Sequence, residues 1–258
     1  MKTLILTLTL LTIFSFTPSK KEFTPPGTVR INDTLYADET EVSNFSWTEY
    51  ELWVFTKYGK NSKEYKAVLP DTLVWKRDLS YNEPYVKYYY RHPAYRDYPL
   101  VGVSYEQAVE FCKWRTERVK DFLSKAKKYD QMNFYYRLPS KAEWELLSYG
   151  GRSEFSNKGR NEKKQMKMNI TRDTIQYKGD LGYMNDNADV TAPVCSYWKN
   201  FFGLYNMIGN VAEMVQEKGI SKGGGWRSNF EDCRVGKDIP YTNTEAWLGF
   251  RCVCVVKK

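Results

Sequence analysis

Three segments of this chain carry the same helix-start signal, and little else in it looks regular. In each, a serine is followed three residues later by an acid or an amide. This is the spacing of a capping box, in which each of the two side chains bonds to the backbone N–H of the other residue. The three signals are Ser46–Glu49, Ser104–Gln107 and Ser140–Glu143. They predict helices that run to about Tyr58, through residues 105–122, and up to Gly150.

The extended segments between these helices are short. They are residues 28–31, 35–37, 73–75 and 250–256. Residues 152–190 are polar, charged and irregular, and a loop of that length is usually functional or held by something such as a metal. No Gly/Ser-rich or Pro-rich linker divides the chain, and no repeat stands out. We therefore expect one α+β domain over residues 18–258, with little regular secondary structure and long loops.

Residues 1–17 have the pattern of a secretory signal peptide, although its cleavage site is left open. Lys2 precedes an uncharged apolar run from Thr3 to Phe16, and polar residues follow. The run is too short to cross a bilayer as a helix, and no later run is long enough. No cysteine follows it that could take a lipid anchor. We expect an exported protein, periplasmic or at the cell surface, without a membrane span, in a compartment that permits disulfides.

A single histidine, His92, limits the chemistry available to the chain. It excludes sites that need two or more His ligands from one chain, such as facial-triad iron and His-rich zinc sites. His92 precedes a proline in a tyrosine-rich segment, which favours a structural role over a catalytic base. The net charge of +8 is spread out, with acids between the bases, so we expect no nucleic-acid partner. The 16% of aromatic residues suits the core of a loop-rich fold or a surface that binds glycan or protein.

A domain with so many loops needs cross-links, and the sequence offers two kinds. Cys112, in a predicted helix, and Cys252, in the predicted last strand, would close a loop of more than 100 residues if paired. The chain-entropy model gives such a loop roughly 5 kcal/mol of stabilisation. The total of five cysteines leaves at least one thiol free or joined to another chain. In the segment 206–213, oxygens of Asn206 and Glu213 with backbone carbonyls suit Ca²⁺, although an ordinary turn is the alternative.

Several motifs, taken in order, resemble one family. They are Asp38–Asn44, Pro99–Ser104, Phe111–Trp114, Arg137–Glu145, Thr191–Val194, Phe202–Asn210, Gly223–Trp226 and Leu248–Arg251. Each motif alone is unspecific, but together they resemble the sulfatase-modifying-factor, or formylglycine-generating-enzyme, domain over roughly residues 25–258.

This resemblance implies a C-type-lectin-like α+β fold that is stabilised by Ca²⁺. The calcium ligands of the family correspond to two sets in this chain, which act through side-chain or backbone oxygens. The sets are Asn206, Gly209, Val211 and Glu213, and Asn169, Ile170, Asp186 and Ala188. The resemblance also implies a disulfide between Cys112 and Cys252. We interpret Arg137, Glu143 and Glu145 as a buried polar network of the fold rather than as an acid/base pair.

The chain departs from the family where the family does its chemistry. The oxidases of the family use two cysteines, five residues apart, to bind copper, and soft thiolates are what select Cu(I). Here the second position is Cys233 but the first is Ser228, and Gly225 replaces the active-site serine. Ala212 and Met214 replace two tryptophans. We therefore interpret Gly225, Ser228 and Cys233 as a vestigial site, and expect neither bound copper nor formylglycine formation.

Residues 185–189 and 192–198 resemble Bacteroidota envelope proteins, among them gliding-motility and type IX secretion lipoproteins that use this fold as a scaffold. The sequence therefore predicts an exported, non-catalytic scaffold or binding component of a bacterial cell-envelope assembly. Its expected partners are envelope proteins, such as outer-membrane proteins. The alternative is an atypical metal-dependent oxidase of the family that acts on a peptide or small substrate through Cys233. Whether Cys195 pairs with Cys233 is left open.

Overall fold

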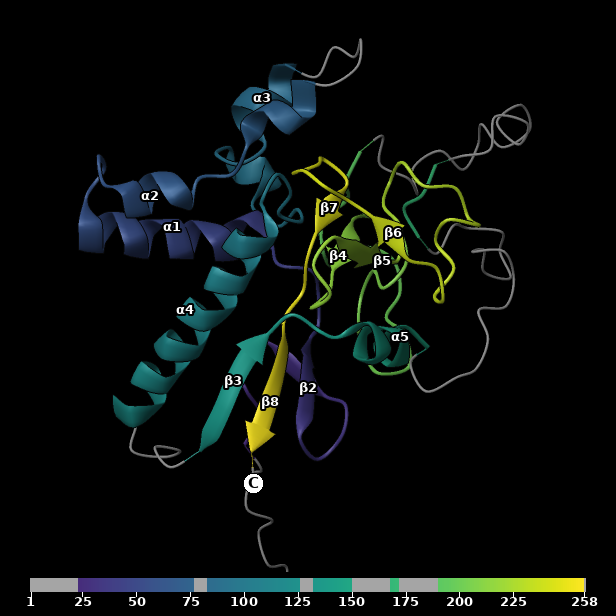
Figure 1. Cartoon of the computed structure of the whole chain (residues 1–258), viewed down its shortest axis with the longest axis horizontal. Coiled ribbons are helices and arrows are strands. Elements are labelled where there is room, and N and C mark those ends of the chain that lie inside the picture. Colours follow the sequence, from purple (N-terminus) through teal and green to yellow (C-terminus); the bar gives the residue numbers. More distant parts are fainter. Residues whose placement is uncertain (1–22, 77–82, 126–131, 150–167, 172–189, 258) are drawn as a thin grey trace, which may run out of the picture.

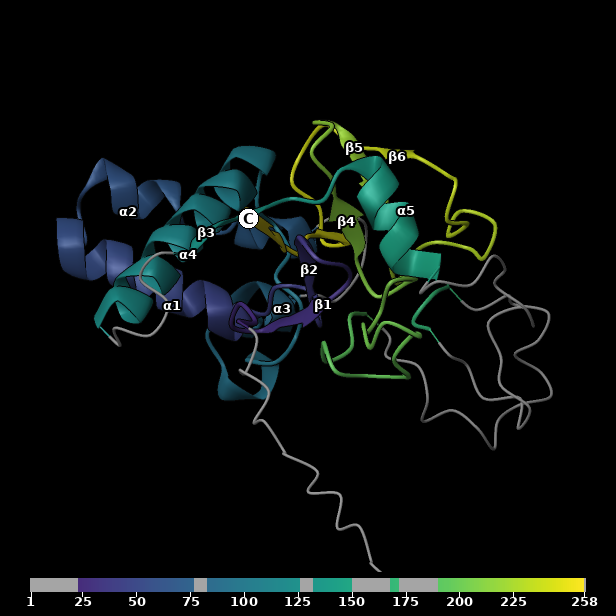
Figure 2. The ribbon, with the colours of Figure 1, turned by 90° about the horizontal axis from the view of Figure 1, so that it is seen from below.

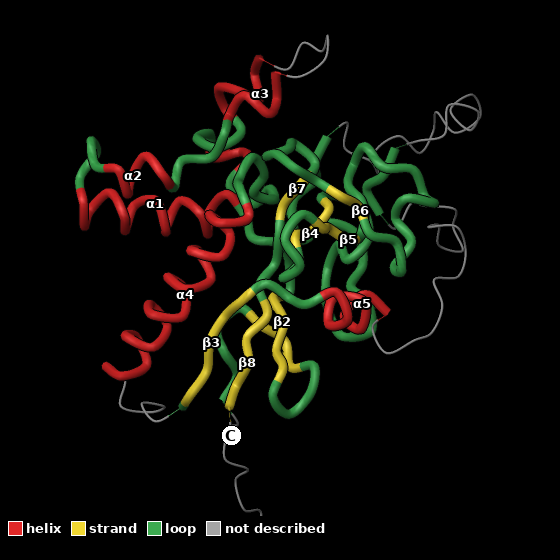
Figure 3. The backbone as a smooth tube through the Cα atoms, in the orientation of Figure 1, coloured by secondary structure: helices red, strands yellow, loops and turns green. Residues whose placement is uncertain are grey.

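The computed structural model describes residues 23–76, 83–125, 132–149, 168–171 and 190–257. In it, short helices and two small sheets are connected by long loops (Figures 1 and 3). The helices are α1 (Asn44–Tyr58), α2 (Lys63–Ala67), α3 (Glu83–Tyr88), α4 (Tyr105–Lys125) and α5 (Lys141–Tyr149), with 3₁₀ helices at Thr72–Lys76 and Pro93–Tyr95. The strands are β1 (Thr28–Arg30), β2 (Leu35–Asp38), β3 (Asn133–Arg137), β4 (Ala212–Met214), β5 (Ile220–Lys222), β6 (Ile239–Pro240), β7 (Leu248–Gly249) and β8 (Val253–Lys257). The expected α+β fold with little regular structure is confirmed.

The structure has two sheets, and the first of them places the end of the described chain beside its beginning. The first has strand order β1-β2-β8-β3, with antiparallel neighbours throughout. The second has order β6-β5-β4-β7, in which β4 runs parallel to β7 and the other neighbours are antiparallel. Helices α1, α2 and α4 lie on one side of the sheets and α5 on the other (Figures 1 and 2). No helix among the described residues is long and apolar enough to cross a membrane.

Two of the three predicted capping boxes are confirmed. At the start of α4, Gln107 N donates to Ser104 Oγ at 3.2 Å and Ser104 N donates to Gln107 Oε1 at 2.7 Å. At the start of α5, Glu143 N donates to Ser140 Oγ at 3.2 Å and Ser140 N donates to Glu143 Oε2 at 2.8 Å. Each reciprocal pair satisfies two backbone N–H groups that a helix leaves without partners.

The start of α1 was predicted about one turn too late. Ser43, not Ser46, is the N-cap, because its Oγ accepts a hydrogen bond from Ser46 N at 3.2 Å. Residues 73–75 were predicted to be extended but lie in a 3₁₀ helix. There Asp71 Oδ1 accepts a hydrogen bond from Leu73 N at 2.9 Å, and this local turn outweighs the strand preference of the apolar run.

Aromatic side chains make much of the core where α1 crosses α4. Trp47 stacks on Phe111 with ring centroids 5.4 Å apart, and Phe250 meets Phe111 edge-on at 5.6 Å. Trp47 Nε1 donates to Val68 O at 3.0 Å, so its one polar atom is satisfied inside the core. A second buried cluster includes Trp144 and lies under α5. The structure thus uses much of its aromatic content for packing.

The two cysteines predicted to pair are close together and buried. Cys112 lies within α4, and Cys252 directly precedes β8 rather than lying in the last strand as predicted. Their sulfur atoms are 3.4 Å apart, and both residues are thiols in this structure. The disulfide itself therefore stays a prediction.

We predict that protein secreted into an oxidising medium contains a bond between Cys112 and Cys252. Peptide mapping without reduction, after blocking of thiols in denaturant, should recover the two residues as one cross-linked peptide. Because the bond would close a loop with a sequence separation of 140, its reduction should lower the free energy of unfolding by up to about 5 kcal/mol. Cys254→Ala is the control, since it removes a buried thiol and leaves the pair intact. Recovery of both cysteines as blocked thiols would contradict the prediction.

Candidate functional site

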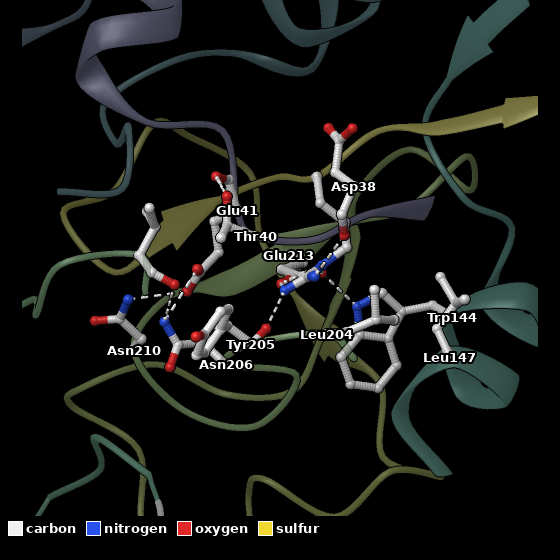
Figure 4. Close-up of polar contacts among 12 residues, drawn as sticks. Asp38, Thr40, Glu41, Trp144, Leu147, Leu204, Tyr205, Asn206, Asn210 and Glu213 are labelled. Atoms are coloured by element: carbon white, nitrogen blue, oxygen red, sulfur yellow. Dashed lines mark hydrogen bonds and ion pairs between the residues drawn. The ribbon is translucent and has the colours of Figure 1, made fainter. Parts of the chain in front are cut away.

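Arg251 and Glu213 form a buried ion pair at the point where the two sheets meet (Figure 4). Their side chains are 0% and 1% exposed. Arg251 Nη2 donates to Glu213 Oε1 at 2.6 Å, and Arg251 Nε donates to both oxygens, at 2.9 and 2.8 Å. Trp144 Nε1, from α5, adds a fourth hydrogen bond to Glu213 Oε2 at 2.7 Å. Both carboxylate oxygens thus accept hydrogen bonds from at least two donors, with the single N–H of Arg251 Nε shared between them.

The guanidinium of Arg251 also holds the end of strand β2 and a loop. Arg251 Nη1 donates to Asp38 O at 3.1 Å, directly after the pairing of β2 with β8, and Nη2 donates to Tyr205 O at 2.8 Å. Glu213 is placed by β4, which pairs in parallel with β7 and sets Glu213 opposite Gly249. The ion pair therefore connects both sheets, α5 and the loop that contains Tyr205.

A second buried carboxylate, Glu41, lies beside this pair and is 1% exposed (Figure 4). Its oxygens accept hydrogen bonds from Asn206 Nδ2 at 3.1 Å and from Asn210 Nδ2 at 2.9 Å. Burial raises the pKa of Glu41 to about 8, although the positive charge of Arg251 opposes part of that rise. At neutral pH, Glu41 is therefore mostly protonated in the folded protein.

The loop that carries Asn206 and Asn210 is tightly curled and packs on residues 169–170. Asn206, Gly209 and Asn210 all have positive φ angles, 49°, 79° and 64°, which Asn and Gly adopt more readily than other residues. A Cβ at Gly209 would lie 2.5 Å from Asn169 O, so only glycine fits there. Asn210 N donates to Asn169 O at 2.7 Å, which joins the two segments.

The structure brings predicted calcium ligands close together, and other groups already bond to the one carboxylate among the described ligands. Asn169 and Ile170 contact Gly209, whereas the predicted ligands Asp186 and Ala188 lie outside the described residues. Glu213 is the only carboxylate of the other set, which also contains Val211, and its oxygens are occupied by Arg251 and Trp144. A calcium ion would have to displace a buried guanidinium.

No cluster of three or more His, Cys, Asp or Glu side chains suited to a metal occurs in the described part of the chain. Calcium stays a prediction, and a lower melting temperature after chelation would support it.

At the site that we interpret as vestigial, the thiol of Cys233 and the hydroxyl of Ser228 lie next to the turn at Gly224 and Gly225. Ser228 Oγ accepts a hydrogen bond from Gly225 N at 3.0 Å. A Cβ at Gly224, whose φ is 68°, would lie 2.3 Å from Cys233 Sγ and 3.2 Å from Ser228 Oγ. Burial raises the pKa of Cys233 to about 12, and a hydrogen bond with Ser228 only partly offsets this. The sulfur is therefore a thiol at neutral pH, and a thiol is a poor nucleophile and a poor metal ligand.

The sequence did not reveal the buried ion pairs of Lys222. This side chain is fully buried, with Nζ 2.7 Å from Glu145 Oε1 and 3.2 Å from Asp238 Oδ1, and no motif around Lys222 predicted this. Glu145 was predicted to join a network with Arg137 and Glu143 but pairs with Lys222 instead. Arg137 and Glu143 do pair, at 2.6 Å.

His92 has a structural role. Its Nδ1 accepts a hydrogen bond from Ala94 N at 3.2 Å and so caps the 3₁₀ helix Pro93–Tyr95. The side chain ends there at the surface, consistent with the structural interpretation of the sequence.

Glu213→Gln should destabilise the fold strongly, because it leaves the buried charge of Arg251 without a counter-charge. We expect a loss of about 3–5 kcal/mol in the free energy of unfolding, measured by urea denaturation. Glu110→Gln is the matched control: it breaks a 2.6 Å pair with Lys113 at the surface, where the side chains are 58% and 62% exposed. That control should cost less than about 1 kcal/mol. Equal small losses in both variants would refute the importance of the buried pair.

Stability should fall as the pH rises from about 5 to 8, owing to Glu41. The folded-state pKa is about 8, against an ordinary value of 4.5, so over this range the unfolded chain has lost a proton that the folded chain keeps. Below pH 4.5 both states carry the proton, and above pH 8 both have lost it. The expected slope approaches about 1.4 kcal/mol per pH unit. Glu41→Gln should flatten the profile in urea denaturation at several pH values, and parallel profiles for the two proteins would contradict this.

Comparison with known proteins identifies the family. The family model for the sulfatase-modifying factor enzyme 1-like domain matches residues 11–256. The chain is 31% identical over 136 residues to the formylglycine-generating enzyme of Mycobacterium tuberculosis, covering 48% of this chain and 38% of that protein. It is 31% identical over 116 residues to chaperone protein LppX of Paenibacillus barcinonensis, covering 39% and 41%. The chain thus spans less than half the length of these curated relatives.

A solved structure supports the fold. Treponema denticola variable protein 1 superposes with a TM-score of 0.50 over 90% of this chain and 92% of that chain, at 18% sequence identity. With the family match over residues 11–256, the chain belongs to the sulfatase-modifying factor enzyme 1-like family.

Proposed function

We propose that this chain is a non-catalytic member of its family and serves as a scaffold or binding component of a bacterial cell-envelope assembly. The observation that carries the proposal is the residue beside Cys233. It is Ser228, with a hydroxyl, at the position where the family's copper-binding oxidases have a second cysteine. The fold, the glycine turn and the buried ion pair are all retained around this position. What differs is the one feature that copper chemistry requires.

Two physical effects oppose copper binding at Cys233. A hydroxyl is a hard ligand and does not replace the second soft thiolate that Cu(I) prefers. In addition, burial raises the pKa of Cys233 to about 12, so binding through a thiolate would first require an unfavourable deprotonation. The first effect acts at Ser228 Oγ and the second at Cys233 Sγ, and each alone would weaken binding.

A binding role is supported by the range of proteins that share this domain. One curated relative is named a chaperone protein, and the chain covers 41% of it. The signal-peptide pattern of residues 1–17 supports export to the periplasm or the cell surface. The resemblance to Bacteroidota gliding-motility and type IX secretion proteins suggests other envelope proteins as partners.

Anaerobic titration with Cu(I) tests the loss of catalysis. The unaltered protein should not retain stoichiometric copper against a competing chelator. Ser228→Cys should bind Cu(I) at least about tenfold more tightly, because it supplies a second thiol beside Cys233. Asn229→Cys is the matched control, since it adds a thiol to the neighbouring exposed residue. Stoichiometric Cu(I) binding by the unaltered protein, with conversion of a cysteine-containing peptide, would instead favour the atypical oxidase.

Co-purification from the producing cells tests the scaffold role separately. After crosslinking of intact cells, the chain should be recovered from the envelope fraction in a complex of fixed stoichiometry. Recovery only as a monomer, with no crosslinked envelope protein, would contradict the scaffold role even if copper binding is absent.

A further inference from the structure

Helices α1 and α2 form an arm that projects from the rest of the fold. The two helices run side by side, and the turn that joins them lies far from both sheets (Figures 1 and 2). α1 ends at Gly59, whose N–H donates to Phe55 O, and Ser62 caps the start of α2. The tip of the arm is therefore a defined turn between two capped helix ends.

Large apolar side chains of α1 are exposed on this arm, although the ring of Phe55 also meets that of Tyr65 in α2, with centroids 5.4 Å apart. Trp47, Tyr50 and Val54 of α1 are buried in the core. Leu52, Phe55 and Tyr58, which follow one another at intervals of three residues, are 61%, 40% and 45% exposed. Side chains with this spacing lie along one ridge of a helix. The arm thus presents an apolar ridge near its tip.

Lysines surround the same ridge, and within the described residues none of them forms an ion pair. Lys57, Lys60 and Lys63 are all exposed, and Lys57 Nζ lies over the rings of Trp53 and Tyr58, at 4.6 and 4.9 Å. Many lysines elsewhere pair with acids, as Lys113, Lys125, Lys199, Lys218 and Lys237 do. Lys66 adds a further positive charge on α2, against the exposed acids Glu49 and Glu64.

We infer that this arm-tip patch, made of Leu52, Phe55, Tyr58, Lys57, Lys60 and Lys63, docks on the surface of an anionic lipid bilayer. Exposed apolar side chains that are flanked by unpaired lysines suit a surface with acyl chains below and negative headgroups above. A second copy of the chain would bring lysines against lysines, and that repulsion disfavours self-association through this face. The lysine stems can extend so that their ammonium groups reach the headgroups while Leu52 and Phe55 insert.

Sedimentation with lipid vesicles tests the inference. The protein used begins at Lys20, because the described core starts at Phe23 and the apolar run 3–16 would itself bind lipid. Vesicles with 30 mol% phosphatidylglycerol in phosphatidylcholine, a composition of roughly typical anionic charge, should bind the protein at least about tenfold more strongly than pure phosphatidylcholine vesicles. Binding to the anionic vesicles should weaken as the NaCl concentration rises.

Matched variants assign the binding to the patch. Leu52→Ser with Phe55→Ser, and separately Lys60→Gln with Lys63→Gln, should each lower partitioning about tenfold or more. The controls lie at the far end of α4: Phe122→Ser, which loses a 66% exposed ring, and Lys120→Gln with Lys125→Gln, which removes the same charge although Lys125 pairs with Asp121. The controls should bind as the unaltered protein does, and unchanged melting temperatures would show that the arm variants remain folded.

Two outcomes would overturn the inference. One is equal partitioning by patch and control variants, or equal binding to anionic and neutral vesicles. The other is the absence of vesicle binding together with a dimer, or a complex with an acidic protein. In either case Leu52→Ser would dissociate the assembly. That second result would assign the patch to a protein interface.

Discussion

The buried pair of Arg251 and Glu213 is the interaction on which the rest of the fold depends. It joins the strand β4, the segment before β8, the helix α5, the end of β2 and the loop that contains Tyr205, in a region with little regular structure. A pair of charges removed from water needs further hydrogen bonds to offset its desolvation, and Trp144, Asp38 O and Tyr205 O supply them here. The short strands around it could not hold these loops by backbone pairing alone. The pair thus holds loops in place, as backbone pairing in larger sheets does in other folds.

This account explains how a family member can keep the fold without the copper site. The ion pair, the curled loop 206–210 and the glycine turn at Gly224 are all present in this chain and serve its packing. The redox centre depends on a second sulfur next to Cys233, which packing does not require. A serine in that position keeps a hydrogen bond to Gly225 N and so costs the fold little. The proposed loss of catalysis is therefore compatible with this fold at the level of single residues.

Local signals in the sequence were sufficient for α4 and α5, because a capping box involves residues only three positions apart. They were ambiguous for α1, where Ser43 and Ser46 both precede helical residues and only the fold decides between them. Residues 73–75 were misassigned because Asp71 turns an apolar run, and β3 was missed because its register is set by β8, far along the chain. The contacts of Glu41 and Lys222 are long-range, so no local pattern could have revealed them.

The central claim is that this family member keeps the fold without the oxygen chemistry. Oxygen uptake by the purified, Cu(I)-supplied protein in the presence of a cysteine-containing peptide tests it most directly. We expect uptake no faster than that of Cu(I) and peptide without protein, because Cys233 has a hydroxyl neighbour and a pKa raised to about 12. Uptake above that background, abolished in Cys233→Ala and coupled to oxidation of the peptide cysteine, would contradict the account.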